Sequence, residues 1–295
     1  MKDISELIGC RYPVIQGAMG IISNPEMVAA VSEAGGYGLL ATGFIQDLEV
    51  LKQGIERVRA LTDQPFGLNI PAWTPLSLGI AGMAADMGLP AVTTSAGPPE
   101  AICAFLKDKG VKVLGVVASV ANALKAEAAG VDAVIAEGTE SGGLQGPNGV
   151  STLVLVPAVV DAVRVPVVAA GGIADSRGYR AALALGAMGV QVGTRFMAST
   201  ECVAHARTKE AIVRAAENQT LLIPMGRGLA RVIRTPFVDQ RIESGEGVSM
   251  EELRARQARV YCEGDLEAGP VGAGQVAGLI REVRSVRDIV EDMVR

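Results

Sequence analysis

The chain has 295 residues, a length that suits one large barrel domain or two ordinary domains. Aromatic residues make up only 3% of the chain, and this scarcity favours closely layered strands and helices over a β-sandwich. The formal net charge of −5 is spread along the chain, so the sequence offers no basic face for nucleic acid.

The termini and the cysteines indicate a cytoplasmic protein. Residues 1–15 contain no apolar signal-peptide core, and the most apolar stretch, 153–173, is interrupted by Asp161, Arg164 and two prolines. We therefore expect neither secretion nor a membrane span. The four cysteines have no metal-type spacing and the chain has one histidine, His205, so we expect reduced thiols and no metal site.

Eight short apolar runs, each followed by a helical pattern, dominate residues 1–200. The predicted strands are 13–19, 37–42, 66–70, 89–96, 111–118, 132–138, 166–172 and 189–196. Continuous apolar runs are typical of parallel strands that are covered on both faces. Helices are expected after Asn24-Pro25 and after Asp175-Ser176, since these residues are suited to cap a helix.

Eight strand–helix units favour an α/β fold of the (β/α)8 TIM-barrel type. A doubly wound open sheet is the alternative, but its GxGxxG fingerprint is absent, because the first turn has the sequence QGAMG over residues 16–20.

Residues after 200 do not continue the repeat. The sequence predicts a polar helix over 201–218, an arginine- and glycine-rich stretch, a charged helix over 249–261, and a glycine-rich turn over 269–274 that opens a last amphipathic helix. We divide the chain into a barrel (1–220), a lid or insertion (221–265) and a closing helical segment (266–295). The amphipathic closing helix also leads us to expect a homodimer.

Two glycine-containing strand ends predict a phosphate site. In TIM barrels, the loops after the seventh and eighth strands often hold phosphate. Here these strands end at Gly171-Gly172 and at Gly193-Thr194. Glycines let a phosphate approach backbone N–H groups closely, and Thr194 adds a hydroxyl donor. Tight turns without a ligand are the alternative for each glycine pair.

Two further strand ends carry polar or flexible residues. The sixth ends in EGTESGGLQG over 137–146, a loop that can lie flat against a planar ring, and Asn69 ends the third with an amide that can bond the heteroatoms of such a ring. A surface loop and a turn are the alternatives. Weaker candidates for a catalytic or binding role are Cys202, Glu140, Asp175 and the arginines of 227–234. His205 is expected to be a surface or packing residue.

Six sequence pieces together resemble one known family. They are YPVIQGAM, PFGLNI, DAVIAEGTESGG, PVVAAGGIADSRG, GVQVGTRFMASTEC and GAGQVAGLI, and they extend in order from Tyr12 to Ile280. The chain resembles the nitronate monooxygenase (2-nitropropane dioxygenase) family, which includes the related FMN-dependent enoyl-acyl-carrier-protein reductase II.

The resemblance implies that residues 1–220 form an FMN-binding barrel. It places Gly17, Ala18 and Met19 beside the flavin ring, Asn69 at its polar edge, and Glu137 with Gly142 and Gly143 along the ring and ribityl side. It also implies that the phosphate is bound by Gly171, Gly172, Gly193 and Thr194. Gln275 of the closing segment would approach the ring.

Leu144 departs from the family pattern. Relatives usually have a histidine after the glycine pair of this loop, and that group abstracts or donates the substrate proton. The resemblance therefore implies that this chain is poor at ionising a neutral nitroalkane. An already ionised nitronate needs no base, and neither does hydride transfer from NADH or NADPH to flavin.

These residues favour an oxidoreductase that oxidises nitronates or passes hydride from NAD(P)H through flavin to a small organic substrate. An FMN-dependent enoyl reductase, with an acyl-carrier protein as partner, is the first alternative. A flavin-binding protein with little turnover is the second, because the loop histidine is missing. A flavin-free barrel that binds a sugar or nucleotide phosphate is the third.

Overall fold

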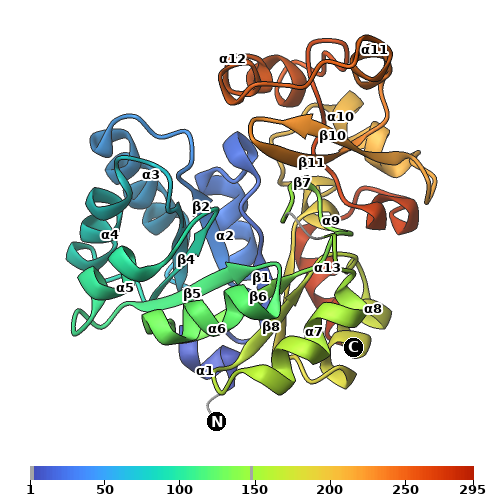
Figure 1. Cartoon of the computed structure of the whole chain (residues 1–295). Coiled ribbons are helices and arrows are strands. Elements are labelled where there is room, and N and C mark those ends of the chain that lie inside the picture. The colour runs from blue at the N-terminus through green and yellow to red at the C-terminus, as the bar shows by residue number, and fades with distance from the viewer. Residues whose placement is uncertain (1–2, 147–148) are drawn as a thin grey trace.

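The structure is a computed structural model that describes residues 3–146 and 149–295 (Figure 1). Eight parallel strands form its central sheet: β1 (Val14–Gln16), β2 (Gly38–Ala41), β3 (Phe66–Pro71), β4 (Ala91–Ser95), β5 (Lys112–Val117), β6 (Ala133–Glu137), β8 (Val167–Ala170) and β9 (Gly189–Val192). Their order is β1-β9-β8-β6-β5-β4-β3-β2, and a parallel bridge between Ile15 and Tyr37 joins the two ends. The sheet is therefore a closed barrel, and the predicted TIM-barrel fold is confirmed.

Helices alternate with these strands on the outside of the barrel. They are α2 (Pro25–Glu33), α3 (Leu48–Leu61), α4 (Ser77–Asp86), α5 (Glu100–Leu106), α6 (Val120–Ala129), α7 (Thr152–Ala162) and α8 (Ser176–Ala184). Asn24 and Asp175 cap α2 and α8, as predicted, because their side-chain oxygens accept bonds from backbone N–H groups of the first turn. The short helices α1 (Ile4–Ile8) and η1 (Gly20–Ile22) flank β1.

The core has two layers, which strand alternation separates. Residues of one set, such as Leu39, Ile135 and Val168, fill the barrel lumen, and Ile4 and Ile8 of α1 pack into the same cluster. The alternate residues, such as Val134 and Val190, pack outward against the helices. Because α1 closes the amino end of the lumen, the carboxyl end is the one left for a ligand.

The lid contains a second, smaller sheet over the barrel mouth (Figure 1). Strands β10 (Thr220–Met225) and β11 (Gly228–Ile233) form an antiparallel hairpin, and β7 (Gly143–Leu144) from the sixth-strand loop pairs with β11. Helices α11 (Pro236–Ser244) and α12 (Met250–Tyr261) follow, and α12 contacts η1. The hairpin and α11 share a small core that includes Ile223, Val232 and Phe237.

The closing segment returns to the barrel. It contains η2 (Gln275–Leu279) and α13 (Val286–Met293). The η2 helix contacts α9 (Thr194–Met197) and α10 (Ala206–Val213). Helix α13 packs against α2 and α8, and it thereby takes the place of the eighth barrel helix.

Some predicted boundaries differ from the structure. The predicted strand 189–196 ends at Val192, since α9 begins at Thr194, and the helix predicted over 201–218 is only the shorter α10. The glycine-rich turn leads into η2 rather than directly into a long helix. The hairpin was not foreseen, although the charged helix was. The division of the chain at 220 and 265 stays a prediction.

Candidate functional site

A cavity of about 760 Å³ opens at the carboxyl end of the barrel, beneath the lid. Its volume lies in the range of sites that hold cofactors and small molecules. The strand-end loops predicted from the sequence converge on it: Gly17, Ala18, Met19, Asn69, Glu137, Gly142, Gly143, Leu144, Gly171, Gly172, Gly193 and Thr194 all line its wall. Gln275 does not, because its side chain is exposed at the start of η2.

Polar side chains form the floor of the cavity. Since lumen-facing residues alternate along each strand, the layer above the apolar lumen core contains Asn69, Glu137 and Gln191. The Asn69 amide nitrogen donates to Thr93 Oγ1 (3.0 Å) and Ser95 Oγ (3.3 Å), which fixes the amide plane. Gln191 was not predicted as a site residue. A polar residue inside the apolar strand GVQV is the sequence feature that could have indicated it.

Glu137 has a perturbed acidity. Burial at the end of β6 raises the pKa of its carboxyl from the usual 4.5 to about 7, and a hydrogen bond from the Ser141 side chain offsets part of that effect. The side chain is half-buried and lines the cavity. The floor therefore carries a carboxyl group that changes charge near neutral pH.

The two glycine-containing loops form a cradle at one side of the floor. Gly171 and Gly172 have φ of 96° and 75°, a left-handed conformation that favours glycine. The next strand end, Gly193-Thr194, begins the short helix α9. In the described part of the chain, the N–H groups of Gly172 and Thr194 donate to no protein acceptor. Free N–H groups on two adjacent strand ends suit a phosphate.

The loop after β1 is held in place from below. The Gly17 N–H donates to Val192 O (2.8 Å), and the Met19 N–H donates to Ser23 Oγ (2.8 Å). Gln16 Nε2 donates to the same Ser23 hydroxyl (2.8 Å). These bonds present the backbone of residues 17–19 to the cavity as a rigid edge.

The sixth-strand loop is fixed between the barrel and the lid. Arg231 of β11 donates from Nε to Thr139 O (2.8 Å), and Gln145 N donates to Leu229 O (2.9 Å). Glu140, a weaker acid–base candidate, accepts bonds from Thr152 N and Oγ1 at the start of α7. Glu140 is therefore engaged in capping a helix, and Arg231 in holding the loop.

An apolar chamber lies above the floor. Its wall contains Phe44 and Trp73 on barrel loops and Met225, Met250 and Leu253 on the lid. The sequence did not predict these residues, because they come from segments with no shared motif. Leu144 belongs to this apolar part, on β7, and its side chain is 42% exposed, so it offers no acid or base to a substrate.

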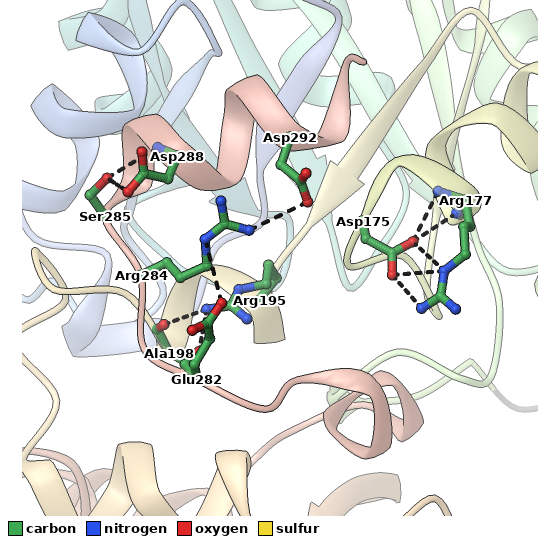
Figure 2. A network of polar contacts seen from close by, with 10 residues as sticks. Asp175, Arg177, Arg195, Ala198, Glu282, Arg284, Ser285, Asp288 and Asp292 are labelled. Atoms are coloured by element: carbon green, nitrogen blue, oxygen red, sulfur yellow. Dashed lines mark hydrogen bonds and ion pairs between the residues drawn. The ribbon is translucent and has the colours of Figure 1, made fainter.

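Asp175 belongs to a polar network outside the cavity. Figure 2 shows Asp175 with Arg177, and Arg284 with Asp292, while Arg195 reaches the backbone oxygens of Ala198 (2.7 Å) and Glu282 (2.8 Å). The Arg177 side chain lowers the pKa of Asp175, so Asp175 is a helix cap and ion-pair partner rather than a base.

The remaining candidates lie away from the cavity. The Cys202 thiol is buried, burial raises its pKa, and it does not line the cavity. His205 caps α10, where its Nδ1 accepts from Arg207 N. In residues 3–146 and 149–295, no group of three or more His, Cys, Asp or Glu side chains could hold a metal ion, and no helix is long and apolar enough to cross a membrane.

Comparisons with known proteins agree with this geometry. FabK from Thermotoga maritima is 42% identical in sequence, with a TM-score of 0.91 over 99% of this chain and 95% of that one. A (3aS,4S,5R,7aS)-5-hydroxy-7a-methyl-1-oxo-octahydro-1H-indene-4-carboxyl-CoA dehydrogenase of Mycobacterium tuberculosis is 32% identical over 99% of this chain and 94% of its own length.

A probable nitronate monooxygenase of Staphylococcus saprophyticus is 35% identical over 81% of this chain and 80% of its own length. The family model of nitronate monooxygenase matches residues 2–87 and 80–295, nearly the whole chain. The chain therefore belongs to the nitronate monooxygenase family of oxidoreductases, as its sequence pieces predicted.

Proposed function

We propose that this protein is an FMN-dependent oxidoreductase of nitronate monooxygenase type. It oxidises nitronates, or it passes hydride from NADH or NADPH through the flavin to a small organic acceptor. The observation that carries the proposal is the two-part cavity, in which a polar floor with a phosphate cradle lies below an apolar chamber. The floor suits a cofactor with a polar ring and a phosphate, and the chamber suits an organic substrate.

The residues present fit FMN. The free N–H groups of Gly172 and Thr194 are donors for its phosphate, and the glycines leave room for close approach. The edge formed by residues 17–19 and the Asn69 amide would border its ring. Bound FMN supplies a group that accepts and returns two electrons. The protein's own part is to hold that group, to exclude water and to position the substrate.

Leu144 favours substrates that need no proton transfer at the loop. A nitronate is already an anion, and a nucleotide hydride needs no base. With an apolar side chain at this position, the chamber orients such substrates without ionising them.

An absorption spectrum of the purified protein, reconstituted with FMN, tests the proposal. We expect a flavin spectrum that is lost on anaerobic addition of either a nitronate or a nicotinamide nucleotide, and that returns with oxygen. Protein that takes up no FMN, or bound FMN that neither reagent reduces, contradicts the proposal. In the second case the protein is a flavin binder with little turnover.

Reduction of an enoyl thioester is a second candidate function. It is favoured by the 42% identity to FabK over nearly the full chain and by the apolar chamber, which suits an acyl chain. Under this candidate an acyl-carrier protein or coenzyme A delivers the substrate. Oxidation of NAD(P)H that requires an enoyl thioester, with no turnover of nitronates, would select it.

A further inference from the structure

Glu137 projects into the cavity from below. It is the last residue of β6, and Ala133 and Ile135 of the same strand are buried in the lumen core. Since residues two and four apart share a face of a strand, the Glu137 side chain continues this row upward to the floor. The barrel wall thus fixes the backbone of Glu137, and Ser141 of the following loop hydrogen-bonds to its carboxyl.

This carboxyl has no countercharge. Desolvation raises its pKa to about 7, the Ser141 hydrogen bond lowers it, and no charged side chain among the described residues contributes. Its neighbour Glu140 is engaged by Thr152. A half-buried carboxyl without a cation nearby is poorly stabilised when it is charged, and proteins retain such groups where a proton is moved.

The other ionisable groups around β6 do not take this role. On adjoining elements, Glu100 of α5 and Lys125 of α6 are exposed at the cavity rim. Lys112 and Asp132 pair with each other (2.8 Å) at the amino ends of β5 and β6, the opposite end of the barrel. The Tyr261 hydroxyl of α12 also lines the cavity, but it accepts the Gly272 N–H (2.9 Å).

We propose that Glu137 is a proton-storing group of the flavin site, which binds one proton when the cofactor is reduced and releases it on reoxidation. The inference rests on the proposed function, because it needs FMN in the cavity. Hydride leaves NAD(P)H, which becomes NAD(P)⁺, and brings two electrons and one proton, so one negative charge enters the cavity. Glu137 offsets that charge by taking a proton from water, and the proton returns to water when the electrons pass to the acceptor.

The pH dependence of the FMN reduction potential tests this inference. The charge added on reduction favours the protonated carboxyl and raises the pKa of Glu137 from about 7 to a higher value. Between about pH 7 and the raised pKa of the reduced state, reduction should therefore consume up to one additional proton. A tenfold change in the equilibrium constant of a two-electron reaction corresponds to about 30 mV. The plot of the wild-type reduction potential against pH should therefore be steeper, by about 30 mV per pH unit, than it would be without a titrating carboxyl.

Glu137→Gln should remove this additional slope, whereas Glu100→Gln, the same change at the rim of the cavity, should keep it. Reduction is driven photochemically, so that the measurement depends on no substrate. A dye in weakly buffered solution should report that Glu137→Gln takes up fewer protons on reduction than the wild type, by up to one per flavin, just above pH 7. An unchanged slope and proton count in FMN-loaded Glu137→Gln would overturn the inference.

Two further outcomes keep this inference separate from the proposed function. If Glu137→Gln fails to hold FMN, infrared titration of the two apoproteins replaces the potential measurement. A carboxyl band that titrates near pH 7 should be present in the wild type and absent from the variant. The same band in the variant overturns the inference. If the wild type holds FMN but turns over no substrate, the proposed function fails. The pH dependence of the FMN reduction potential still tests this inference in that case. Wild-type protein that takes up no FMN overturns both.

Discussion

The floor and the chamber share one cavity but are held in different ways. The floor is built on a closed, hydrogen-bonded sheet, so Asn69, Glu137 and Gln191 are held by three strands of the barrel, β3, β6 and β9, over a filled lumen. The chamber is assembled from separate segments, namely barrel loops, β7, the β10–β11 hairpin and α12, and the hairpin packs on a small core that it shares with α11. Its methionines and leucines adapt in shape more readily than the floor.

Under the proposed function, the floor holds the cofactor and the chamber receives the substrate. A cofactor that stays bound through every turnover needs fixed donors, and the floor provides them. The names of the relatives refer to different substrates, a nitronate in one case and an indene-4-carboxyl-CoA in another, and the chamber is the part that can change without disturbing the sheet. Changes in the chamber should therefore alter catalysis, and changes in the floor should alter cofactor binding.

The largest effect is expected in the chamber. Leu144→His restores a base at the loop position, and a positioned general base contributes roughly 10²–10⁴ in rate. We expect oxidation of a neutral nitroalkane to rise by at least about a hundredfold, while the dissociation constant for FMN stays unchanged. Leu229→His, a similarly exposed leucine on β11 outside the cavity, is the control. No rise with Leu144→His would mean that residue 144 does not reach the substrate.

A substitution in the floor should alter cofactor binding. Gly171→Ala puts a side chain on a residue with φ of 96°, and its Cβ would lie 2.9 Å from Gly138 O and 3.0 Å from Thr152 Oγ1. Such strain costs about 1–3 kcal/mol, and we expect the FMN dissociation constant to rise by about ten- to a hundredfold.

Gly130→Ala separates cofactor binding from strain, because Gly130 has φ of 92° with open space around it, at the end of α6. It should lower stability but leave the FMN dissociation constant unchanged, as measured by fluorescence titration. Equal effects of the two alanines on FMN would show that the cradle has no special part in binding.

The contrast also explains how much of the molecule could be predicted from sequence. Strand periodicity and the glycine pairs belong to single segments, so the barrel and most floor residues were found in the sequence. The chamber depends on pairing between distant segments, such as Gly143–Leu144 with Ala230–Arg231, and no local pattern encodes that pairing. The role of Gln275 stays a prediction: its backbone N–H donates to Glu140 O, and its side chain is exposed.

The smallest effect is expected where the two regions meet, at Arg231. Its buried guanidinium joins the lid hairpin to Thr139 O, and a hydrogen bond to a charged group contributes about 1.5–3 kcal/mol. Arg231→Met keeps most of the side-chain volume, and we expect a loss near the lower end, about 1.5 kcal/mol, in the free energy of unfolding by urea. Arg227→Met, at the exposed tip of the same hairpin, should change stability by less than about 0.5 kcal/mol.

If floor and chamber act as separate units, Arg231→Met should also raise KM for the organic substrate while the FMN dissociation constant stays constant. The freed loop would lose its register on β11, whereas the glycine cradle keeps its place on β8 and β9. A parallel loss of FMN binding would instead mean that the lid helps to form the cofactor site, because the sixth-strand loop would then need Arg231 to hold its glycines against the ring.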